Sequence, residues 1–212
     1  CPVLYGIRGD DPDAVARVAD AIESEPVARS REFLTNQGTD AHLRDPTGAL
    51  REDGAYLVDG TVTSAPETRE GGHVFVGFDP ELRGQEEIHC AAFEPTKRFR
   101  DVVRALRPGD RITACGEFSR GTLKLEKLAV RELVREERRT PDCPECGRRM
   151  ESAGADQGYR CRDCDTTAPG KATVPVDRDL EIGWYEVPPR ARRHVAKPLV
   201  RGGFDAPTHA ER

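Results

Sequence analysis

The segment CPECGRRMESAGADQGYRCRDC, residues 143–164, contains four cysteines in two Cys-x-x-Cys pairs with fourteen residues between the pairs. Two turns of this kind bring four thiolates together in the tetrahedral arrangement that structural Zn²⁺ prefers. Gly147 follows the first pair, where the chain must turn, and residues 157–161 lead into the second pair as a hairpin strand. The spacing predicts a zinc ribbon over residues 140–168, although a disulfide pair or an iron site could use the same cysteines. The predicted ligands are Cys143, Cys146, Cys161 and Cys164.

Metal binding would be the main source of folding energy for this segment, because a ribbon of this size has almost no apolar core. Structural Zn²⁺ supplies roughly 10 to 16 kcal/mol to such domains. Cysteine fills all four ligand positions, so we expect a structural site and not a catalytic one. Cys1, Cys90 and Cys115 lie outside the pattern, and we expect them to be small buried hydrophobic residues and not nucleophiles.

Upstream of the ribbon, five short segments have apolar residues near period two, with turn residues between them: residues 55–65, 73–79, 86–95, 110–118 and 122–133. One helical pattern interrupts the series. It begins near Thr96, its apolar residues recur at helical spacing, and it ends at Pro108. Three strands, one helix and two strands is the order of an OB-fold, a five-stranded β-barrel.

The sequence therefore predicts an α+β multidomain protein. Its parts are a short α/β segment over residues 1–50, the OB-fold barrel over residues 54–135, the zinc ribbon over residues 140–168, and a basic C-terminal extension over residues 169–212. OB-folds commonly bind single-stranded nucleic acid, but small barrels also bind proteins and sugars. Phe75 and Phe78 are candidates to stack on bases, and each is equally a candidate core residue, because only a ring on the solvent face can stack.

The C-terminal extension is strongly basic between Glu186 and Asp205, where no acidic residue occurs. Contact with nucleic-acid phosphates is one interpretation of this run, and a solvated tail is the other. An aromatic pair, Trp184 and Tyr185, precedes it. The candidate phosphate-binding residues are Arg190, Arg192, Arg193, Lys197 and Arg201.

The net charge of −5 argues against a simple basic nucleic-acid-binding protein, but the charge is uneven. Residues 131–212 carry 16 Lys and Arg against 15 Asp and Glu, whereas residues 1–130 carry 17 against 23, so the C-terminal part is favoured as the partner of an anion. No apolar run approaches the ~18 residues of a membrane helix, which predicts a soluble, cytoplasmic protein with no membrane partner. Because the sequence begins at Cys1 and not at methionine, we expect the C-terminal part of a longer protein.

The N-terminal stretch predicts a strand over residues 1–9, a glycine-containing turn and a helix that ends at Pro26. Asp11 suits the helix N-cap and Pro12 the first helical position. Arg8 lies between two glycines beside this helix N-terminus. An arginine there can bind a phosphate or carboxylate, although the glycines are equally explained by the turn alone.

The segment FLTNQGTDAHL, residues 33–43, is too polar for a core and resembles no flexible linker in composition. With LYGIRGDDPDAV (residues 4–15), the OB-like region, the cysteine-rich segment and YEVPPRARRHVAKPLVR (residues 185–201), it occurs in the order found in the archaeal 2-agmatinylcytidine synthetases of isoleucine tRNA. The chain resembles this family over nearly its whole length. The resemblance implies a ligase with a kinase-like ATP domain and a ferredoxin-like domain, followed by an OB-fold and a zinc ribbon that hold the tRNA.

The resemblance also implies a reaction, in which ATP and Mg²⁺ activate the wobble cytidine of the CAU anticodon at C2 and agmatine is joined there. Asp40, with Asn36, Gln37 and Thr39, would then hold the cationic agmatine, His42 would accept a proton from its amine, and Arg8 would neutralise phosphate. A purely structural loop is the alternative for these residues.

The acidic ATP-binding motifs of the family are absent from this sequence. The resemblance therefore implies that residues 1–50 are the C-terminal piece of the catalytic region, which comprises the kinase-like and ferredoxin-like domains. We therefore expect a chain that keeps part of the tRNA-binding surface but does not modify tRNA alone. A non-catalytic OB-fold and zinc-ribbon subunit that binds RNA or single-stranded DNA is the alternative function.

Overall fold

The computed structural model describes residues 4–209, and the chain divides into two compact units, Cys1–Asn36 and Gln37–Arg212. The first unit contains one helix, α1 (Pro12–Ala21), whose N-cap Asp11 accepts a hydrogen bond from the Asp13 N–H at 2.9 Å, as predicted. The predicted N-terminal strand is wrong for residues 4–9, which form no regular structure. A strand needs a neighbour for its backbone hydrogen bonds, and no described residue pairs with these. Cys1 lies outside the described residues.

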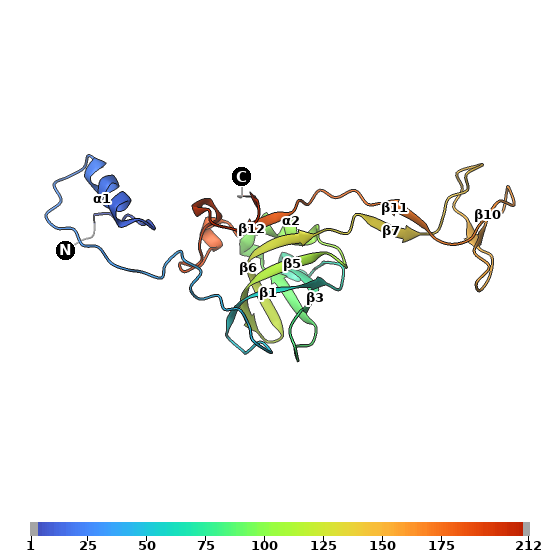
Figure 1. Cartoon of the computed structure of the whole chain (residues 1–212), viewed down its shortest axis with the longest axis horizontal. Coiled ribbons are helices and arrows are strands. Elements are labelled where there is room, and N and C mark those ends of the chain that lie inside the picture. The colour runs from blue at the N-terminus through green and yellow to red at the C-terminus, as the bar shows by residue number, and fades with distance from the viewer. Residues whose placement is uncertain (1–3, 210–212) are drawn as a thin grey trace. The chain divides into compact units, whose positions relative to one another are not determined.

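The second unit is built on a closed five-stranded barrel (Figure 1). Its strands are β1 (Ala55–Val62), β3 (Val74–Pro80), β4 (Ile88–Ala92), β5 (Arg111–Ser119) and β6 (Thr122–Glu132). β1 pairs antiparallel with β3 and β5, β3 pairs antiparallel with β4, β4 pairs parallel with β6, and β6 closes the barrel against β5. This connectivity is that of an OB-fold, so the predicted fold class is confirmed.

Side chains that alternate along these strands fill the barrel, and a short helix covers it. The helix α2 (Phe99–Arg104) follows a 3-10 turn, η2 (Glu94–Thr96), and buries Phe99 and Val103. It starts later than the pattern predicts, because Lys97 has a φ of 48°, which interrupts a right-handed helix. Cys90 and Cys115 are buried, at 0 % and 1 % exposure, as predicted.

The two candidate stacking residues of β3 point in opposite directions. Phe78 is fully buried in the barrel core, so its ring has no face free for a base, and the stacking role predicted for Phe78 is corrected to a core role. Phe75 lies on the outer face and is only partly buried. The period of two along a strand separates the two rings.

The C-terminal segment packs on the barrel and is not a solvated tail. Its strand β12 (Gly183–Glu186) pairs antiparallel with β6, and β13 (Thr208–His209) pairs parallel with β12. Two 3-10 turns follow β12, η3 (Pro189–Ala191) and η4 (Leu199–Arg201). Trp184 and Leu199 are buried against the barrel at 4 % and 1 % exposure. Packing of these apolar residues orders the segment.

The remaining strands belong to the hairpin loop of the barrel and to the ribbon. β2 (Glu67–Thr68) pairs with β3 beside a 3-10 turn, η1 (Glu70–Gly72). After the barrel, β7 (Glu136–Arg139) pairs with β11 (Ala172–Pro175), and these two strands run side by side between the barrel and the ribbon in sequence (Figure 1). The ribbon itself has a three-stranded sheet of β8 (Glu151–Ser152), β9 (Tyr159–Arg160) and β10 (Thr167–Ala168).

The division predicted at residue 50 lies inside the second unit, and the buried Leu50 is part of the barrel core. Among the residues that the structure describes, none of the helices has the length and apolar character needed to cross a bilayer.

Candidate functional site

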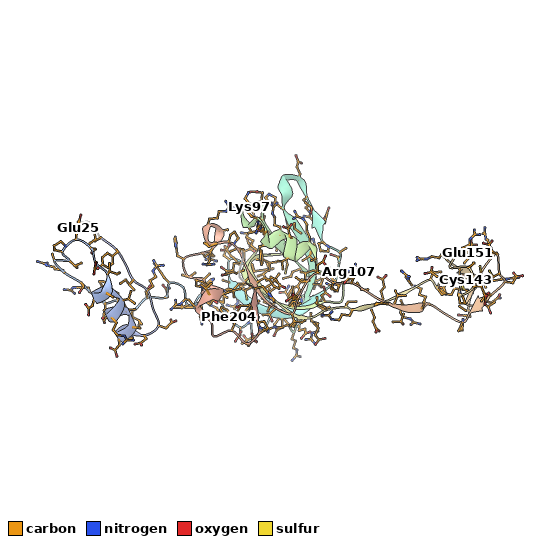
Figure 2. All side chains as sticks on the ribbon, turned by 90° about the horizontal axis from the view of Figure 1, so that it is seen from above. Glu25, Lys97, Arg107, Cys143, Glu151 and Phe204 are labelled. Carbon is orange, nitrogen blue, oxygen red and sulfur yellow. The ribbon has the colours of Figure 1, made fainter. Side chains whose placement is uncertain are left out.

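The four cysteines of the ribbon form a cluster whose sulfur atoms all lie within 4.8 Å of one another. Tetrahedral Zn²⁺ with Zn–S bonds of about 2.3 Å requires sulfur separations of about 3.8 Å, and the Cys146 and Cys161 sulfurs are 3.6 Å apart. None of these four cysteines forms a disulfide. The donor set and its spacing fit a closed structural zinc site, as predicted, and Figure 2 labels Cys143 within it.

The first of the two turns is held by its own backbone. The Cys143 N–H donates to the Arg148 carbonyl at 2.8 Å, and the Gly147 N–H donates back to the Cys143 carbonyl at 2.8 Å. Gly147 has a φ of 72°, a conformation that glycine adopts without a steric penalty. These hydrogen bonds and the conformation of Gly147 define the turn that carries Cys143 and Cys146.

The same turn favours ionisation of one ligand. Burial alone would raise the pKa of the Cys143 thiol, but hydrogen bonds from the backbone N–H groups of Cys146 and Glu145 outweigh it, and the pKa falls to about 6. The pKa of Cys164 is instead raised to about 12, first by its hydrogen bond with Cys146, and that of Cys146 is raised as well. Thiols this close to one another ionise in competition, because neighbouring thiolates repel. The spacing of the four sulfur atoms, and not these pKa values, therefore supports the metal site.

The polar loop of residues 37–43 is bound to the C-terminal segment by backbone hydrogen bonds. The Gly38 N–H donates to the His194 carbonyl at 2.9 Å, and the Thr39 and Asp40 N–H groups donate to the Val195 carbonyl at 3.1 and 2.9 Å. Arg201 returns a side-chain bond to the Gly38 carbonyl at 2.8 Å. The loop and the C-terminal segment therefore form one surface layer on the barrel.

Asp40 ties this layer to the barrel wall. Its two carboxylate oxygens accept hydrogen bonds from the Lys127 ammonium at 2.7 and 2.6 Å, and one of them also accepts the Lys197 backbone N–H at 2.7 Å. Lys127 projects from β6 and is only 1 % exposed, and its third bond goes to the Lys197 carbonyl at 2.8 Å. These contacts account for the Asp40 carboxylate without a substrate.

His42 also has a partner in β6. Its Nε2 lies 2.7 Å from Glu126 Oε1, and the two side chains are 13 % and 7 % exposed. The other polar atoms of this pair, His42 Nδ1 and Glu126 Oε2, are buried without a hydrogen bond to protein. Buried polar atoms of this kind usually bind internal water. Both candidate catalytic residues therefore face the barrel wall.

The predicted phosphate-binding residues divide into two groups. Arg192 is 18 % exposed and donates to the buried Glu186 carboxylate at 2.7 Å, and Arg201 binds Gly38 as described above, so both have structural partners. Arg193 is 44 % exposed beside Glu117 at 3.3 Å. Arg190 is exposed, and the Lys197 ammonium lies 5.2 Å from the centre of the Phe204 ring, which Figure 2 labels.

Phe75 belongs to an aromatic cluster on the outer face of the barrel. Its ring centre is 6.1 Å from that of Phe93 and 6.5 Å from that of His89, both edge to face. The Arg69 guanidinium lies 4.1 Å from the centre of the Phe75 ring. His73 contacts the Phe93 ring at 5.2 Å. Partly exposed rings beside an arginine are typical of surfaces that bind unpaired bases.

The other predicted substrate contacts are distributed over both units. Arg8 is exposed in the first unit, as is Asn36. Gln37 and Thr39 lie in the second unit, where the Thr39 hydroxyl accepts the Ala41 N–H at 3.3 Å. The roles of these four residues stay predictions.

Sequence analysis missed the buried charged residues Glu126, Lys127 and Glu186. The sequence does contain an indication of the first two, since Glu-Lys interrupts the apolar pattern of residues 122–133. A register shift between Cys115 and Gly116 turns both side chains toward partners. The partners of Glu126 and Lys127 are His42 and Asp40 of the polar loop, which lie 84 and 87 residues away in the sequence. A local pattern in residues 122–133 therefore could not predict them.

The fold and the cysteine cluster define an α+β multidomain protein with an OB-fold barrel and a zinc ribbon. Residues 140–180 match the family model described as the TiaS C-terminal zinc ribbon domain, and residues 1–42 match the TiaS FLD domain. Among curated proteins, TiaS of Haloquadratum walsbyi, named as an isoleucine-tRNA 2-agmatinylcytidine synthetase, is 52% identical over 248 residues, covering 100% of this chain and 54% of the relative. The protein of the same name from Methanosarcina mazei is 50% identical, covering 94% of this chain and 47% of the relative.

Solved structures agree with these relatives. The crystal structure of TiaS in complex with its isoleucine tRNA and ATP is 44% identical in sequence and superposes with a TM-score of 0.74, covering 100% of this chain and 50% of that one. The complex of TiaS with the same tRNA, AMPCPP and agmatine gives 40% identity and a TM-score of 0.73, covering 100% and 49%. The chain belongs to the TiaS family of isoleucine-tRNA 2-agmatinylcytidine synthetases, and it spans about half the length of the curated relatives it matches.

Proposed function

We propose that this chain supplies tRNA binding in a cytoplasmic ligase, which uses ATP and Mg²⁺ to join agmatine to C2 of the wobble cytidine in the AUA-decoding isoleucine tRNA. One observation carries the proposal. A solved structure described as a complex of TiaS with its isoleucine tRNA and ATP matches 100% of this chain at 44% identity. The CAU anticodon and the need for Mg²⁺ are part of the proposal and rest on the family resemblance.

The chemistry of this reaction makes RNA binding demanding. The C2 oxygen of cytosine is a poor leaving group until ATP phosphorylates it. The amine nitrogen of agmatine then bonds to C2 and loses a proton, and the oxygen leaves as phosphate. Such a transfer requires the base to be held in position while phosphate charge is neutralised. Binding energy from parts of the tRNA remote from the wobble base can supply that positioning.

The aromatic cluster of Phe75, Phe93 and Arg69 is the proposed contact of the barrel with unpaired bases. Phe75 lies on the outer face of strands β3 and β4, the second and third strands of the OB-fold, and ligands commonly bind on that face. Stacking on an aromatic ring is worth about 1 to 3 kcal/mol per base. Arg190 and Arg193, which are exposed, are the proposed phosphate contacts of the C-terminal segment.

In this proposal Asp40 and His42 support the loop and do not react with substrate. Both are engaged with residues of β6, Lys127 and Glu126, at 2.6 to 2.7 Å. A carboxylate that already binds an ammonium attracts a second cation weakly, because the two charges largely cancel. The cationic agmatine would therefore need other carboxylates.

The proposal is tested first by RNA binding. The chain is titrated into fluorescently labelled isoleucine tRNA, with a tRNA of another anticodon and single-stranded DNA as competitors. Preferred binding of the isoleucine tRNA supports the proposal. Equal affinity for all three nucleic acids would instead support a non-catalytic RNA- or DNA-binding subunit.

A second experiment concerns catalysis. The chain is incubated with ATP, Mg²⁺, agmatine and the isoleucine tRNA, and the tRNA is digested and analysed by mass spectrometry. Binding without agmatine conjugation is expected from this chain alone, because the acidic ATP-binding motifs of the resemblance are absent from its sequence. Detection of the agmatine adduct would refute the restriction to binding.

A further inference from the structure

Asp110 and Arg178 form a buried ion pair that the proposed RNA surfaces do not use. Asp110 directly precedes β5 in the sequence, and Arg178 follows β11. Their side chains are 0 % and 2 % exposed. The guanidinium donates two parallel hydrogen bonds to the carboxylate, at 2.8 and 2.6 Å. This two-pronged arrangement is the most directional ion pair available to side chains.

The pair also binds backbone groups from three other places in the chain. Arg178 donates to the carbonyls of Val134 and Ala105, at 2.9 and 3.0 Å. Asp110 accepts the N–H groups of Val134 and Arg107, each at 2.8 Å. The two side chains are shielded from solvent, so the pair has lost hydration that these hydrogen bonds replace.

The position of the pair is informative, because it lies where the chain leaves the barrel and where it returns. Val134 comes two residues before β7, and Arg178 comes three residues after β11. The two strands pair from Glu136 with Pro175 to Arg139 with Ala172, and the Val176 N–H donates to the Arg135 carbonyl at 2.8 Å. Between them lie only the residues of the ribbon. Asp110 thus holds both ends of the ribbon arm, residues 135–177, at one point of the barrel.

Stability alone does not explain a buried ion pair. Removal of two charges from water costs about as much as their attraction returns, and an apolar pair of similar volume often serves equally well. What the charged pair adds is a defined geometry, since two parallel bonds fix both the distance and the angle.

We propose that Asp110 and Arg178 are positioning residues, which fix the root of the zinc-ribbon arm on the barrel so that barrel and ribbon contact one tRNA at the same time. This inference rests on the proposed function. Once the barrel has bound the tRNA, a fixed arm keeps the ribbon at a high effective concentration near the part of the tRNA that the ribbon binds. A loose arm lowers this effective concentration and so weakens the binding of the complete tRNA. The Arg178 side chain itself is too buried to contact RNA, at 2 % exposure.

The test compares two RNAs on the same variants. Arg178→Gln removes the charge and one prong of the pair, and Arg111→Gln is the matched control, because Arg111 forms an exposed pair with Glu81 and follows Asp110 directly in sequence. Affinity is measured for the complete isoleucine tRNA and for its isolated anticodon stem-loop, the fragment that we expect to contact only one of the two domains. Arg178→Gln is expected to weaken binding of the complete tRNA roughly tenfold and to leave stem-loop binding unchanged. Arg111→Gln is expected to change the two affinities by equal factors.

Folding is controlled separately. Zinc content reports the ribbon, and the fluorescence of Trp184, the one tryptophan of the chain, reports the barrel. If Arg178→Gln does not fold, the double replacement Asp110→Leu with Arg178→Met, which leaves no unpaired buried charge, takes its place with the same expectation. Equal losses for both RNAs, or no loss for either, would overturn the positioning role. A wild-type chain that binds no tRNA would instead contradict the proposed function.

Discussion

Replacement of Asp40 by alanine is expected to destabilise the second unit by roughly 3 to 5 kcal/mol, the usual cost of breaking a buried ion pair from one side. The Lys127 side chain is 1 % exposed, and its ammonium donates to three acceptors. Two of the three are the carboxylate oxygens of Asp40, at 2.7 and 2.6 Å, and the third is the Lys197 carbonyl. Alanine would leave that charge buried with only the Lys197 carbonyl, at 2.8 Å. It would also leave the Lys197 N–H without its acceptor at 2.7 Å.

The backbone adds to this cost. Asp40 has a φ of 62°, and alanine in the left-handed region is unfavourable by about 1 kcal/mol or more. Asparagine tolerates this conformation and keeps one acceptor oxygen, so Asp40→Asn should cost clearly less than Asp40→Ala. Asp40 and Asp45 both line a pocket of about 210 Å³. Asp45→Ala is the matched control, because the Asp45 carboxylate is exposed.

The measurement is urea unfolding followed by the fluorescence of Trp184, which is 4 % exposed and lines the same pocket. The change in midpoint, multiplied by the slope of the free energy on urea, gives the loss of stability. A loss below about 1 kcal/mol for Asp40→Ala, or an equal loss for Asp45→Ala, would refute the argument that Asp40 is a structural partner of Lys127. The same unfolding experiment on the double variant Asp40→Ala with Lys127→Met gives a second test. If the loss of stability in the double variant equals the sum of the two single losses, the two side chains are not coupled and the argument is refuted as well.

Three further predictions concern the metal and the RNA. A chelator should unfold the ribbon, because zinc supplies most of its folding energy. The barrel should stay folded, so the fluorescence of Trp184 should not change. Unfolding of the barrel together with the ribbon would contradict the prediction that the barrel folds independently of the metal. Phe75→Ala should weaken tRNA binding by roughly 5- to 150-fold, the equivalent of about 1 to 3 kcal/mol of stacking. Phe78→Ala, in the core, should instead lower the free energy of unfolding by about 3 to 5 kcal/mol. Unchanged tRNA affinity for Phe75→Ala would show that Phe75 is not part of the RNA interface. If two or more phosphates are contacted, affinity should fall by roughly tenfold or more between about 0.05 and 0.2 M salt, and an affinity independent of salt would rule out phosphate contacts.

The zinc ribbon and the order of the barrel strands could be predicted from the sequence. Two cysteine pairs with tight turns are local patterns, and each carries its own geometry whatever surrounds it. Alternation of apolar residues marks a strand in the same way, since successive side chains point to opposite faces. The predicted segments of residues 55–65 and 110–118 therefore agree closely with β1 and β5.

Prediction failed where a residue needed a distant partner. The segment of residues 1–9 has apolar residues typical of a strand, but no described residue offers residues 4–9 a neighbouring strand. The basic segment between Glu186 and Asp205 has the composition of a solvated tail, yet it packs on the barrel, where Leu199 is buried in one cluster with Trp184. Hydrophobic burial depends on which surfaces meet, and charge composition does not report that.

The sequence by itself thus determined the metal ligands, the barrel and the family that the chain resembles. Only the tertiary structure decided that Phe75 faces solvent and Phe78 the core, that Asp40 binds Lys127, and that Asp110 binds Arg178. The separations in sequence are 87 residues for the first ion pair and 68 for the second. A local pattern reflects the backbone geometry of a few neighbouring residues, whereas an ion pair of this kind exists only after folding has brought two distant segments together and removed the water between them.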